Sequence, residues 1–269
     1  MKSSHTFTSL DDLQYYITPP HDCSYLPKRS ARMVFLDPAQ RIDTLTLSEL
    51  SRSGFRRSGD FVYRPECHSC RQCLSARVPV ANFRPNSSQK KALKNNKDLT
   101  TRIIGLDQIE DHHYQLYEQY IRVRHFDGDM YPPSYEQFEK FLLQSCANTS
   151  FLELWQDDQL MSVAACDHVD DGLSAVYTFF DPFEPKRSLG VYSILQQIEW
   201  VKKLGLDYLY LGYWVPHSHK MTYKAKYTPF EILLDGKWHT IEQQLAEDEI
   251  QRLGDSLLMN LPNSIHKIP

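Results

Sequence analysis

The 269-residue sequence lacks the short motifs that assign a chemistry on their own. It contains no phosphate-binding P-loop, no dinucleotide-binding glycine pattern and no Gly-x-Ser-x-Gly nucleophile turn. Its histidines do not follow the His-Glu-x-x-His spacing of a metalloprotease, so we interpret them as surface residues or hydrogen-bonded core residues. These absences remove the commonest sequence signatures of nucleotide hydrolysis, dinucleotide-dependent redox chemistry and serine or zinc hydrolysis.

Long apolar runs are missing as well. The first sixteen residues contain no hydrophobic segment of a secretory signal, and no stretch approaches the roughly 20 apolar residues that cross a bilayer. We therefore expect a cytoplasmic protein that does not associate with membranes. In that compartment the six cysteines are expected as thiols or metal ligands rather than disulfides.

The net charge of −4 conceals an uneven distribution. Residues 23–102 hold 16 Lys/Arg against 6 Asp/Glu, a net charge of +10, which leaves −14 for the rest of the chain. Such a basic segment favours a polyanionic partner such as RNA, although a solvated basic face is the alternative. The acidic remainder argues for docking one end of a nucleic acid rather than wrapping a long one.

The chain divides into two parts by composition. Residues 1–85 are rich in arginine, cysteine and proline and lack long periodic runs, which predicts a small Cys/Arg-rich N-terminal subdomain. A polar, basic join follows, in which residues 88–97 can form a short helix. We assign residues 86–269 to a catalytic domain.

From residue 99 the apolar pattern changes between strand and helix periods in a regular way. The order of the expected elements, strand-helix-helix-strand-strand-strand-helix-strand-short helix-strand, is that of the GNAT acyltransferase fold. We therefore predict an α/β (α+β) protein with a GNAT-like domain. Its strands are expected at 99–105, 151–155, 160–169, 173–181, 207–215 and 230–234, and its helices at 111–126, 134–145 and 191–205.

The loop before the helix at 191–205 is a candidate anion site. GNAT enzymes hold the pyrophosphate of coenzyme A at this place, because backbone amides at a helix N-terminus bind phosphate. Gly190 suits such an approach, whereas Tyr192 stands where a small residue is needed, which weakens the coenzyme A interpretation. We predict that Arg187, Ser188 and Gly190 contact tRNA, with an ordinary turn as the alternative.

Aromatic and lysine residues alternate after the strand at 207–215. Ligands of open α/β sheets bind at this edge, where Phe179 also ends the neighbouring strand. Aromatic faces stack on unpaired bases while lysines bind phosphate, although core packing is the alternative for each aromatic. The residues concerned are Tyr210, Tyr213, Trp214, Tyr223 and Tyr227, with Lys220, Lys224 and Lys226.

Three cysteines lie at three-residue spacing in "CHSCRQC", namely Cys67, Cys70 and Cys73. Together with the distant Cys23 they have the ligand count of a zinc or iron–sulfur site. Free cysteine also packs readily as a small apolar residue. We favour packing and keep a metal or iron–sulfur site as the less favoured alternative.

Long blocks of the sequence resemble the aminoacyl-tRNA–protein transferases, the arginyl-transferase family. The resemblance is strongest to the bacterial branch, which moves leucine from leucyl-tRNA to proteins that begin with aspartate or glutamate and so marks them for N-degron degradation. It implies a GNAT-like fold, with aminoacyl-tRNA and proteins with acidic N-termini as partners. The blocks are CSYLPKR, LSRSGFRRSGDFVYRPECHSCRQCLSARVPV, RHFDGDM, DGLSAVYTFFDP, RSLGVYSIL and LGYWVPHSHKMTYKAKYTPFE.

The resemblance also bears on the cysteines. Eukaryotic arginyl relatives carry a Cys-x-x-Cys and a Cys-Cys pair that are implicated in metal or iron–sulfur binding. Here Leu26 replaces the second cysteine of the first motif, and Arg71 follows Cys70 in place of the second cysteine of the pair. Since half of that ligand set is missing, we expect no required cofactor besides aminoacyl-tRNA as co-substrate.

The implied reaction is attack of a protein α-amine on an activated aminoacyl ester, which positioning accelerates. We predict Asp181 as the base, with a turn role as its alternative, and Tyr213 or Tyr223 as hydrogen-bond donors. Arg77, presented with Arg71 by the cysteine segment, is expected to bind the acidic side chain of the substrate. Further predicted substrate contacts are Phe179, Trp214 and Lys226, and further tRNA contacts are Lys90, Lys91, Lys94, Lys97, Lys220 and Lys224.

Three other functions stay open from the sequence. Arginine could be the transferred amino acid, since the residues alone do not separate the two branches. A coenzyme A-dependent N-acyltransferase would use the same fold, and a non-enzymatic RNA-binding module would explain the basic segment.

Overall fold

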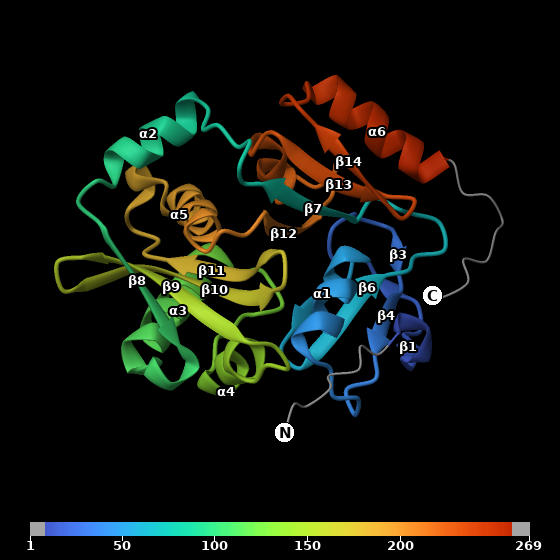
Figure 1. The fold of residues 1–269 in the computed structure, drawn as a ribbon, viewed down its shortest axis with the longest axis horizontal. Coiled ribbons are helices and arrows are strands. Elements are labelled where there is room, and N and C mark those ends of the chain that lie inside the picture. The colour runs from blue at the N-terminus through green and yellow to red at the C-terminus, as the bar shows by residue number, and fades with distance from the viewer. Residues whose placement is uncertain (1–8, 260–269) are drawn as a thin grey trace.

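The computed structural model describes residues 9–259, which form a large mixed sheet with helices on both faces and a smaller sheet at its side (Figure 1). The large sheet has eight strands in the order β14-β13-β7-β12-β11-β10-β9-β8. Among the described strands of this sheet, only β11 and β12 pair in parallel. The strands are β7 (Leu74–Pro79), β8 (Thr100–Gly105), β9 (Thr149–Gln156), β10 (Gln159–Val169), β11 (Gly172–Phe180), β12 (Tyr208–Trp214), β13 (Phe230–Leu234) and β14 (Lys237–Ile241).

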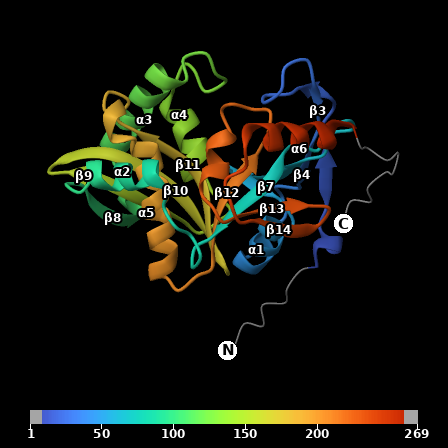
Figure 2. The same ribbon diagram turned by 90° about the horizontal axis from the view of Figure 1, so that it is seen from above.

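Helices cover both faces of this sheet because its central strands are apolar on both sides. Helix α5 (Leu189–Lys203) packs on one face, where Ala164 and Cys166 of β10 lie in the same core cluster as Leu195. Helices α3 (Asp111–Arg124) and α4 (Tyr135–Phe138), the latter continuing into η3 (Glu139–Leu143), pack on the other face around Val163. Figures 1 and 2 show these helices on opposite sides of β10 and β11.

The N-terminal part forms an antiparallel four-stranded sheet in the order β1-β4-β6-β5. Helix α1 begins after Asp43, whose carboxylate accepts a hydrogen bond from the Thr46 amide at 2.8 Å. Leu50 and Phe55 pack in one cluster with Tyr210 of the large sheet, so the two sheets share a core. The elements are β1 (Tyr15–Ile17), β2 (His21–Asp22), β3 (Ser30–Ala31), β4 (Met33–Leu36), α1 (Thr44–Arg52), β5 (Arg56–Ser58) and β6 (Phe61–Pro65).

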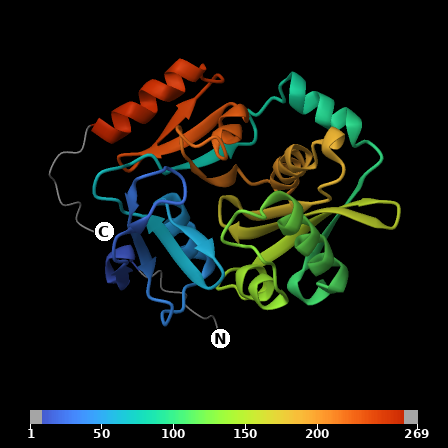
Figure 3. The same cartoon turned by 180° about the vertical axis from the view of Figure 1, so that it is seen from behind.

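Strand β7 precedes residue 85 but lies inside the large sheet, between β12 and β13. The domain boundary at residue 85 stays a prediction. Strand β7 lies before that boundary in the sequence but pairs with β12 and β13, which lie after it. The chain then continues through α2 (Ser87–Asn95), which lies beside α5 in Figures 1 and 3.

The C-terminal part covers the other end of the sheet. The β13–β14 hairpin extends the sheet, and α6 (Glu247–Met259) packs over it through Leu257, in a cluster with Ile232 and Phe230. The remaining elements are short 3-10 helices, namely η1 (Leu10–Asp12), η2 (Leu106–Gln108), η4 (Pro185–Arg187) and η5 (Thr222–Lys226). No helix in residues 9–259 is both long and apolar enough to cross a membrane.

The mixed α/β class is confirmed, and the order of elements from β8 to β13 is the order expected of a GNAT-like domain. The expected strand at 230–234 is reproduced residue for residue, and the helix at 191–205 begins two residues earlier, at Leu189. The structure adds elements that the sequence analysis missed, namely the N-terminal sheet, β14 and α6.

Candidate active site where two strands separate

The parallel strands β11 and β12 stay paired over only three residues each. Their register runs from Gly172↔Tyr208 to Ser174↔Tyr210 and then ends, so residues 175–180 of β11 continue without a β12 partner. Two bulges accompany the separation: β12 has one extra residue between Tyr210 and Gly212 opposite β7, and β11 has one between Ala175 and Tyr177 opposite β10. Because a bulge bends its strand and increases the twist, the two strands diverge beyond this point, and the region between them is here called the split.

Arg56 of β5 fills the closed end of the split. Its Nη2 donates a hydrogen bond of 2.6 Å to the carbonyl oxygen of Ala175 on β11. On the other side its guanidinium lies against Gly212 of β12, where a Cβ atom would be 3.0 Å from Nη2. Gly212 also has φ +79°, so this position favours glycine for its backbone and for the room that it gives Arg56.

Arg56 differs from its neighbour Arg57 in having no carboxylate partner. Arg57 points to the opposite face of β5 and is buried in a bidentate ion pair with Asp167, at 2.6 and 2.8 Å. Arg56 is partly buried, and within residues 9–259 its one side-chain hydrogen bond is to the Ala175 carbonyl. Its charge is therefore not neutralised by the described part of the protein.

Lys224 of η5 is a second cation at the same place. Its side chain is enclosed, with 6% of the residue exposed, and its Nζ donates a 2.6 Å hydrogen bond to the carbonyl oxygen of Tyr213. Burial, and after it the positive charge of Arg56, lower the pKa of Lys224 to about 7, whereas Cys73 acts in the opposite direction and raises it. Lys224 forms no ion pair with any described residue.

Tyrosines line the rest of the site. The Tyr213 hydroxyl donates to the backbone carbonyl of Gly54 at 2.9 Å and lies 3.1 Å from that of Tyr63, which ties β12 to the N-terminal part. The Tyr223 ring lies 5.9 Å from the Lys224 ammonium. Although 41% of Tyr223 is exposed, burial around its hydroxyl raises the pKa of that group to about 12, with Tyr120 raising it and Arg56 lowering it.

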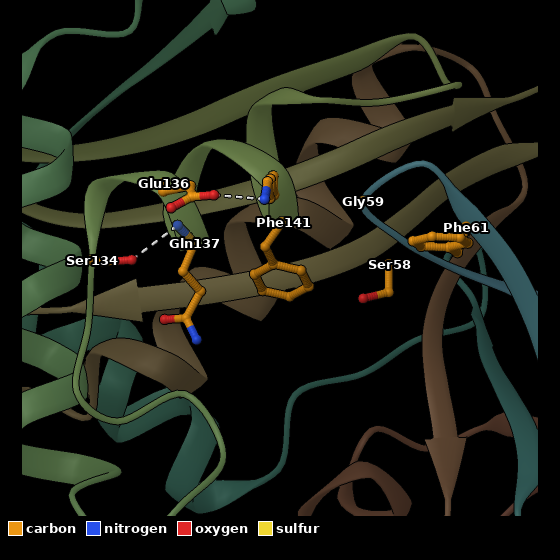
Figure 4. Close-up of a pocket in the computed structure, with 8 residues that line it drawn as sticks. Ser58, Gly59, Phe61, Ser134, Glu136, Gln137 and Phe141 are labelled. Carbon is orange, nitrogen blue, oxygen red and sulfur yellow. Dashed lines mark hydrogen bonds and ion pairs between the residues drawn. The ribbon is translucent and has the colours of Figure 1, made fainter.

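A cavity of about 410 Å³ adjoins the split. Ser58, on the same face of β5 as Arg56, forms one wall with Phe61, and Gln137 and Phe141 face them from the other wall, as Figure 4 shows. The Phe141 ring also contacts Tyr177 of β11, with ring centroids 5.2 Å apart. The cavity therefore lies next to the unpaired part of β11.

The cysteines gather beside this site. The fold brings Cys23 close enough to Cys67, Cys70 and Cys73 that it raises the pKa of each of these three thiols, after burial as the main cause. Cys23 is therefore close to the other three cysteines in space, although it is distant from them in the sequence. Cys73 also raises the pKa of Lys224, so the cysteine segment lies close to the split.

The four thiols have the right chemistry for zinc, but as folded they are not a preformed ligand set. Within residues 9–259, the one set of three ligand side chains close enough to share an ion is His112, His113 and Glu153, whose ligand atoms lie within 4.8 Å of one another. Glu153 is already satisfied there, by His113 Nε2 at 2.6 Å and Trp155 Nε1 at 2.7 Å. His113 is thus the hydrogen-bonded core histidine that the sequence analysis expects.

Arg77 does not lie in the split, and its expected contact with substrate stays a prediction. Its Nε donates to Glu231 at 2.6 Å and its Nη1 to the Tyr210 hydroxyl at 3.1 Å. The guanidinium is also enclosed by the rings of Tyr208 and Trp238, at 3.6 and 4.1 Å. A cation that already has a carboxylate partner and two aromatic rings against its guanidinium holds strands together. Arg71 pairs with Asp235 at 2.9 Å, away from the split.

Two predicted aromatic contacts are corrected by burial. Trp214 is 0% exposed and Phe179 is 1% exposed, each inside a core cluster, so neither ring offers a face to a base or a peptide. Tyr213 is buried with its hydroxyl bonded to backbone, which makes it a wall of the site. Of the predicted catalytic tyrosines, Tyr223 keeps an exposed edge.

Asp181 lies at the open end of β11. Its Oδ1 accepts a 2.9 Å hydrogen bond from the Phe183 amide, and its Oδ2 accepts a 3.4 Å bond from Gln159. Six residues of extended strand separate it from Ala175, about 20 Å along β11. The structure therefore supports its turn role and not a proton transfer at the closed end of the split.

Most of the residues predicted to contact tRNA lie on or next to α2 and at the start of α5. Asn95 and Asn96 donate to the carbonyls of Lys186 and Arg187, which joins the end of α2 to the start of α5. Arg187 itself is occupied by Asp98, at 2.8 and 2.9 Å. The exposed cations of this surface, here called the α2 basic face, are Lys90, Lys91, Lys94 and Lys97.

Five further predicted tRNA or substrate contacts have other settings. A Cβ at Gly190 would lie 3.0 Å from the Phe180 ring, so this glycine serves helix packing. Ser188, Lys220 and Lys226 are exposed, whereas the burial of Lys224 corrects its assignment to the tRNA backbone.

The charge asymmetry has a partly internal cause. Four arginines of the basic segment pair with acids from outside it and so neutralise four of its ten net positive charges. The pairs are Arg52–Asp170, Arg57–Asp167, Arg71–Asp235 and Arg77–Glu231. Arg56 takes no part in this pairing, and it was not among the predicted site residues. The signal that could have indicated it is the pair of adjacent arginines in "GFRRSG", since neighbouring residues on a strand point to opposite faces.

A mixed sheet whose one parallel pair opens over a cationic site is the architecture of a GNAT-like acyl-transferring enzyme. The family model described as "Arginine-tRNA-protein transferase, N terminus" matches residues 21–91, and the one described as "Arginine-tRNA-protein transferase, C terminus" matches residues 112–234. The chain belongs to this family of transferases, which confirms the resemblance seen in the sequence.

Curated relatives match nearly the whole chain. An aspartate/glutamate leucyltransferase of Acinetobacter baumannii is 67% identical over 263 residues, which cover 98% of this chain and 97% of the relative. The protein of the same description from Pseudomonas fluorescens is 48% identical and covers 86% and 98%. Among solved structures, the C-terminal domain of a lysylphosphatidylglycerol synthetase from Agrobacterium fabrum matches with TM-score 0.46 and 15% identity, over 78% of this chain and 68% of that one.

Proposed function

We propose that the protein transfers leucine from leucyl-tRNA to the N-terminal aspartate or glutamate of protein substrates in the cytoplasm, which marks them for N-degron degradation. The observation that carries this proposal is the 67% identity, over 98% of the chain, to relatives described as aspartate/glutamate leucyltransferases. The split and its cations supply the site in which such a transfer can take place.

The reaction forms an amide bond and breaks an ester bond. The substrate α-amine attacks the leucyl carbonyl carbon, the ribose oxygen of the tRNA 3′ end leaves, and the proton lost by the amine ends on that oxygen or on water. A free α-ammonium has a pKa of about 7.7–8.0, so its deprotonation costs little near neutral pH. Holding the two reactants in contact is therefore the main task of the protein, and we propose that no metal takes part.

The protein substrate enters the split as an extended chain in this proposal. Beyond Ser174, β11 has backbone groups without a β12 partner, and an extended peptide can pair with such an edge. The tRNA approaches from the α2 basic face, whose lysines are exposed and unpaired within the described part of the chain. The two substrates then meet at the separated strands.

One feature of the cavity favours leucine over arginine as the transferred residue. Its lining includes the rings of Phe61 and Phe141, which suit an apolar side chain. Its one acidic lining residue, Glu136, is already paired with Lys140 at 2.6 Å. A transferred arginine would find no free carboxylate among the residues that line this cavity.

The test is transfer from radiolabelled leucyl-tRNA or arginyl-tRNA to peptides that begin with Asp, Glu, Arg or Ala. We expect labelled product only from leucyl-tRNA with the Asp and Glu peptides. Product from arginyl-tRNA at a similar rate would reassign the protein to arginyl transfer, and absence of product from either tRNA with any peptide would refute the proposal.

A further inference from the structure

Two cations share the closed end of the split, and the described part of the protein gives neither of them an anion. Arg56 bonds one backbone carbonyl, and Lys224 bonds another. Two acids of the large sheet are already occupied by other arginines: Asp167 by Arg57 and Glu231 by Arg77. Lys224 is buried and Arg56 is partly buried, so two like charges without a counter-ion destabilise the folded protein here, and an anion from outside would offset this cost.

The position of these cations indicates which anion they receive. The pair lies inside, beside β5 and β12, whereas the exposed lysines suited to a polymer of phosphates lie on α2. A single carboxylate matches the planar fork of an arginine, and an extended chain paired along residues 175–180 ends next to the Arg56–Ala175 contact.

We propose that Arg56 and Lys224 bind the side-chain carboxylate of the substrate's first residue and thereby select proteins that begin with aspartate or glutamate. This inference rests on the proposed function, because it names the residues that read the acidic N-terminus. It replaces Arg77, whose guanidinium is enclosed, as the specificity determinant.

Lys224 adds a pH dependence to this recognition. The groups that face it are Arg56 from β5, Cys73 from the segment before β7, the Tyr213 carbonyl from β12, and Tyr223 from its own turn. With a pKa of about 7, Lys224 is partly neutral in the free protein, and a bound carboxylate favours its protonated form. Binding of an acidic peptide therefore takes up a proton, and its affinity falls as pH rises above 7, by up to about tenfold per pH unit.

The experiment compares peptides that begin with Asp or with its neutral isostere Asn, in wild type, Arg56→Met, Arg56→Lys and the control Arg102→Met. Arg102 lies on the edge strand β8, over the Trp155 ring. Binding of each peptide is measured by calorimetry between pH 6 and 9 without tRNA, and transfer is measured with leucyl-tRNA. Thermal melting confirms that each variant is folded, and Arg56→Lys keeps the charge that Arg56→Met removes.

Wild type and the Arg102 control are expected to prefer the Asp peptide, with an affinity that falls as pH rises. In Arg56→Met this preference should fall by about 10- to 100-fold, the effect of truncating one partner of a charged hydrogen bond, with tRNA affinity unchanged. Arg56→Lys should keep part of the preference.

Three outcomes overturn the inference. The first is an unchanged Asp preference in Arg56→Met, the second is equal binding of both peptides to wild type, and the third is an equal loss for both peptides together with weaker tRNA binding, which would assign Arg56 to the tRNA. The proposed function fails separately, if wild type transfers no leucine to peptides that it binds.

Discussion

Replacing Lys224 by methionine is expected to stabilise the protein at acidic pH while it impairs transfer to Asp peptides. Burial lowers the pKa of Lys224 from 10.5 to about 7. At about 1.4 kcal/mol per pKa unit, keeping this lysine charged in the folded state costs roughly 5 kcal/mol at pH 6. Methionine has a similar length and no charge, so it removes that cost.

The direction of the pH dependence follows from proton binding. Between about pH 7 and 10.5 the unfolded chain keeps a proton on Lys224 that the folded protein has lost, so wild-type stability rises with pH in this window. At pH 9 the cost of burying Lys224 has fallen to roughly 2 kcal/mol. The stability difference between variant and wild type should therefore shrink by about 3 kcal/mol from pH 6 to pH 9.

A second effect opposes the gain but does not depend on pH. The variant leaves the Tyr213 carbonyl without the Lys224 donor, which costs about 1–3 kcal/mol. We therefore expect Lys224→Met to be more stable than wild type by about 2–4 kcal/mol at pH 6 and nearly equal to it at pH 9.

The assay is urea unfolding of both proteins at pH 6 and pH 9. Lys226→Met, two residues on at an exposed position, is the matched control and should show no pH-dependent difference from wild type. A stability difference between Lys224→Met and wild type that is the same at the two pH values would refute the reasoning, because it would show that Lys224 does not titrate in the folded protein near neutral pH.

Four further outcomes are expected. Gly212→Ala should lose about 1–3 kcal/mol of stability and most Asp-peptide transfer, because alanine is strained at this φ and its Cβ displaces Arg56. The control is Gly236→Ala, which has a similar φ and open space around it, so thermal melting of this variant measures the backbone cost alone. Arg77→Met should cost about 3–5 kcal/mol in urea unfolding by leaving Glu231 unpaired, and adding Glu231→Gln should recover part of that loss, whereas no recovery would contradict a role in holding the strands. Transfer should survive metal chelation, and loss of activity that zinc or iron restores would return the four cysteines to the centre of the mechanism. The α2 basic face is neutralised by changing Lys90, Lys91, Lys94 and Lys97 to glutamine. This should reduce the log–log slope of tRNA affinity against salt concentration by roughly 0.7–0.9 for each phosphate that the protein no longer binds, and an unchanged slope would place the tRNA elsewhere.

Elements whose signal is local could be predicted from the sequence alone. From β8 to β13 each helix and strand carries its own apolar period and its own boundary residues, such as Ser134, whose hydroxyl caps α4. The four-stranded N-terminal sheet was missed because its strands are three to five residues long, too short to show a clear apolar period. Likewise β7 reads as part of the cysteine segment, and only its pairing with β12 and β13 places it in the large sheet.

The site divides in the same way. The sequence by itself determined the family, the transfer chemistry and the supply of cations and aromatic residues, because those depend on residue type and order. It could not say which arginine is available: Arg77 and Arg57 meet carboxylates from strands more than a hundred residues away, and Arg56 meets a backbone carbonyl. Only the tertiary structure decided this, since a charge is neutralised, enclosed or left free by the groups that folding brings next to it.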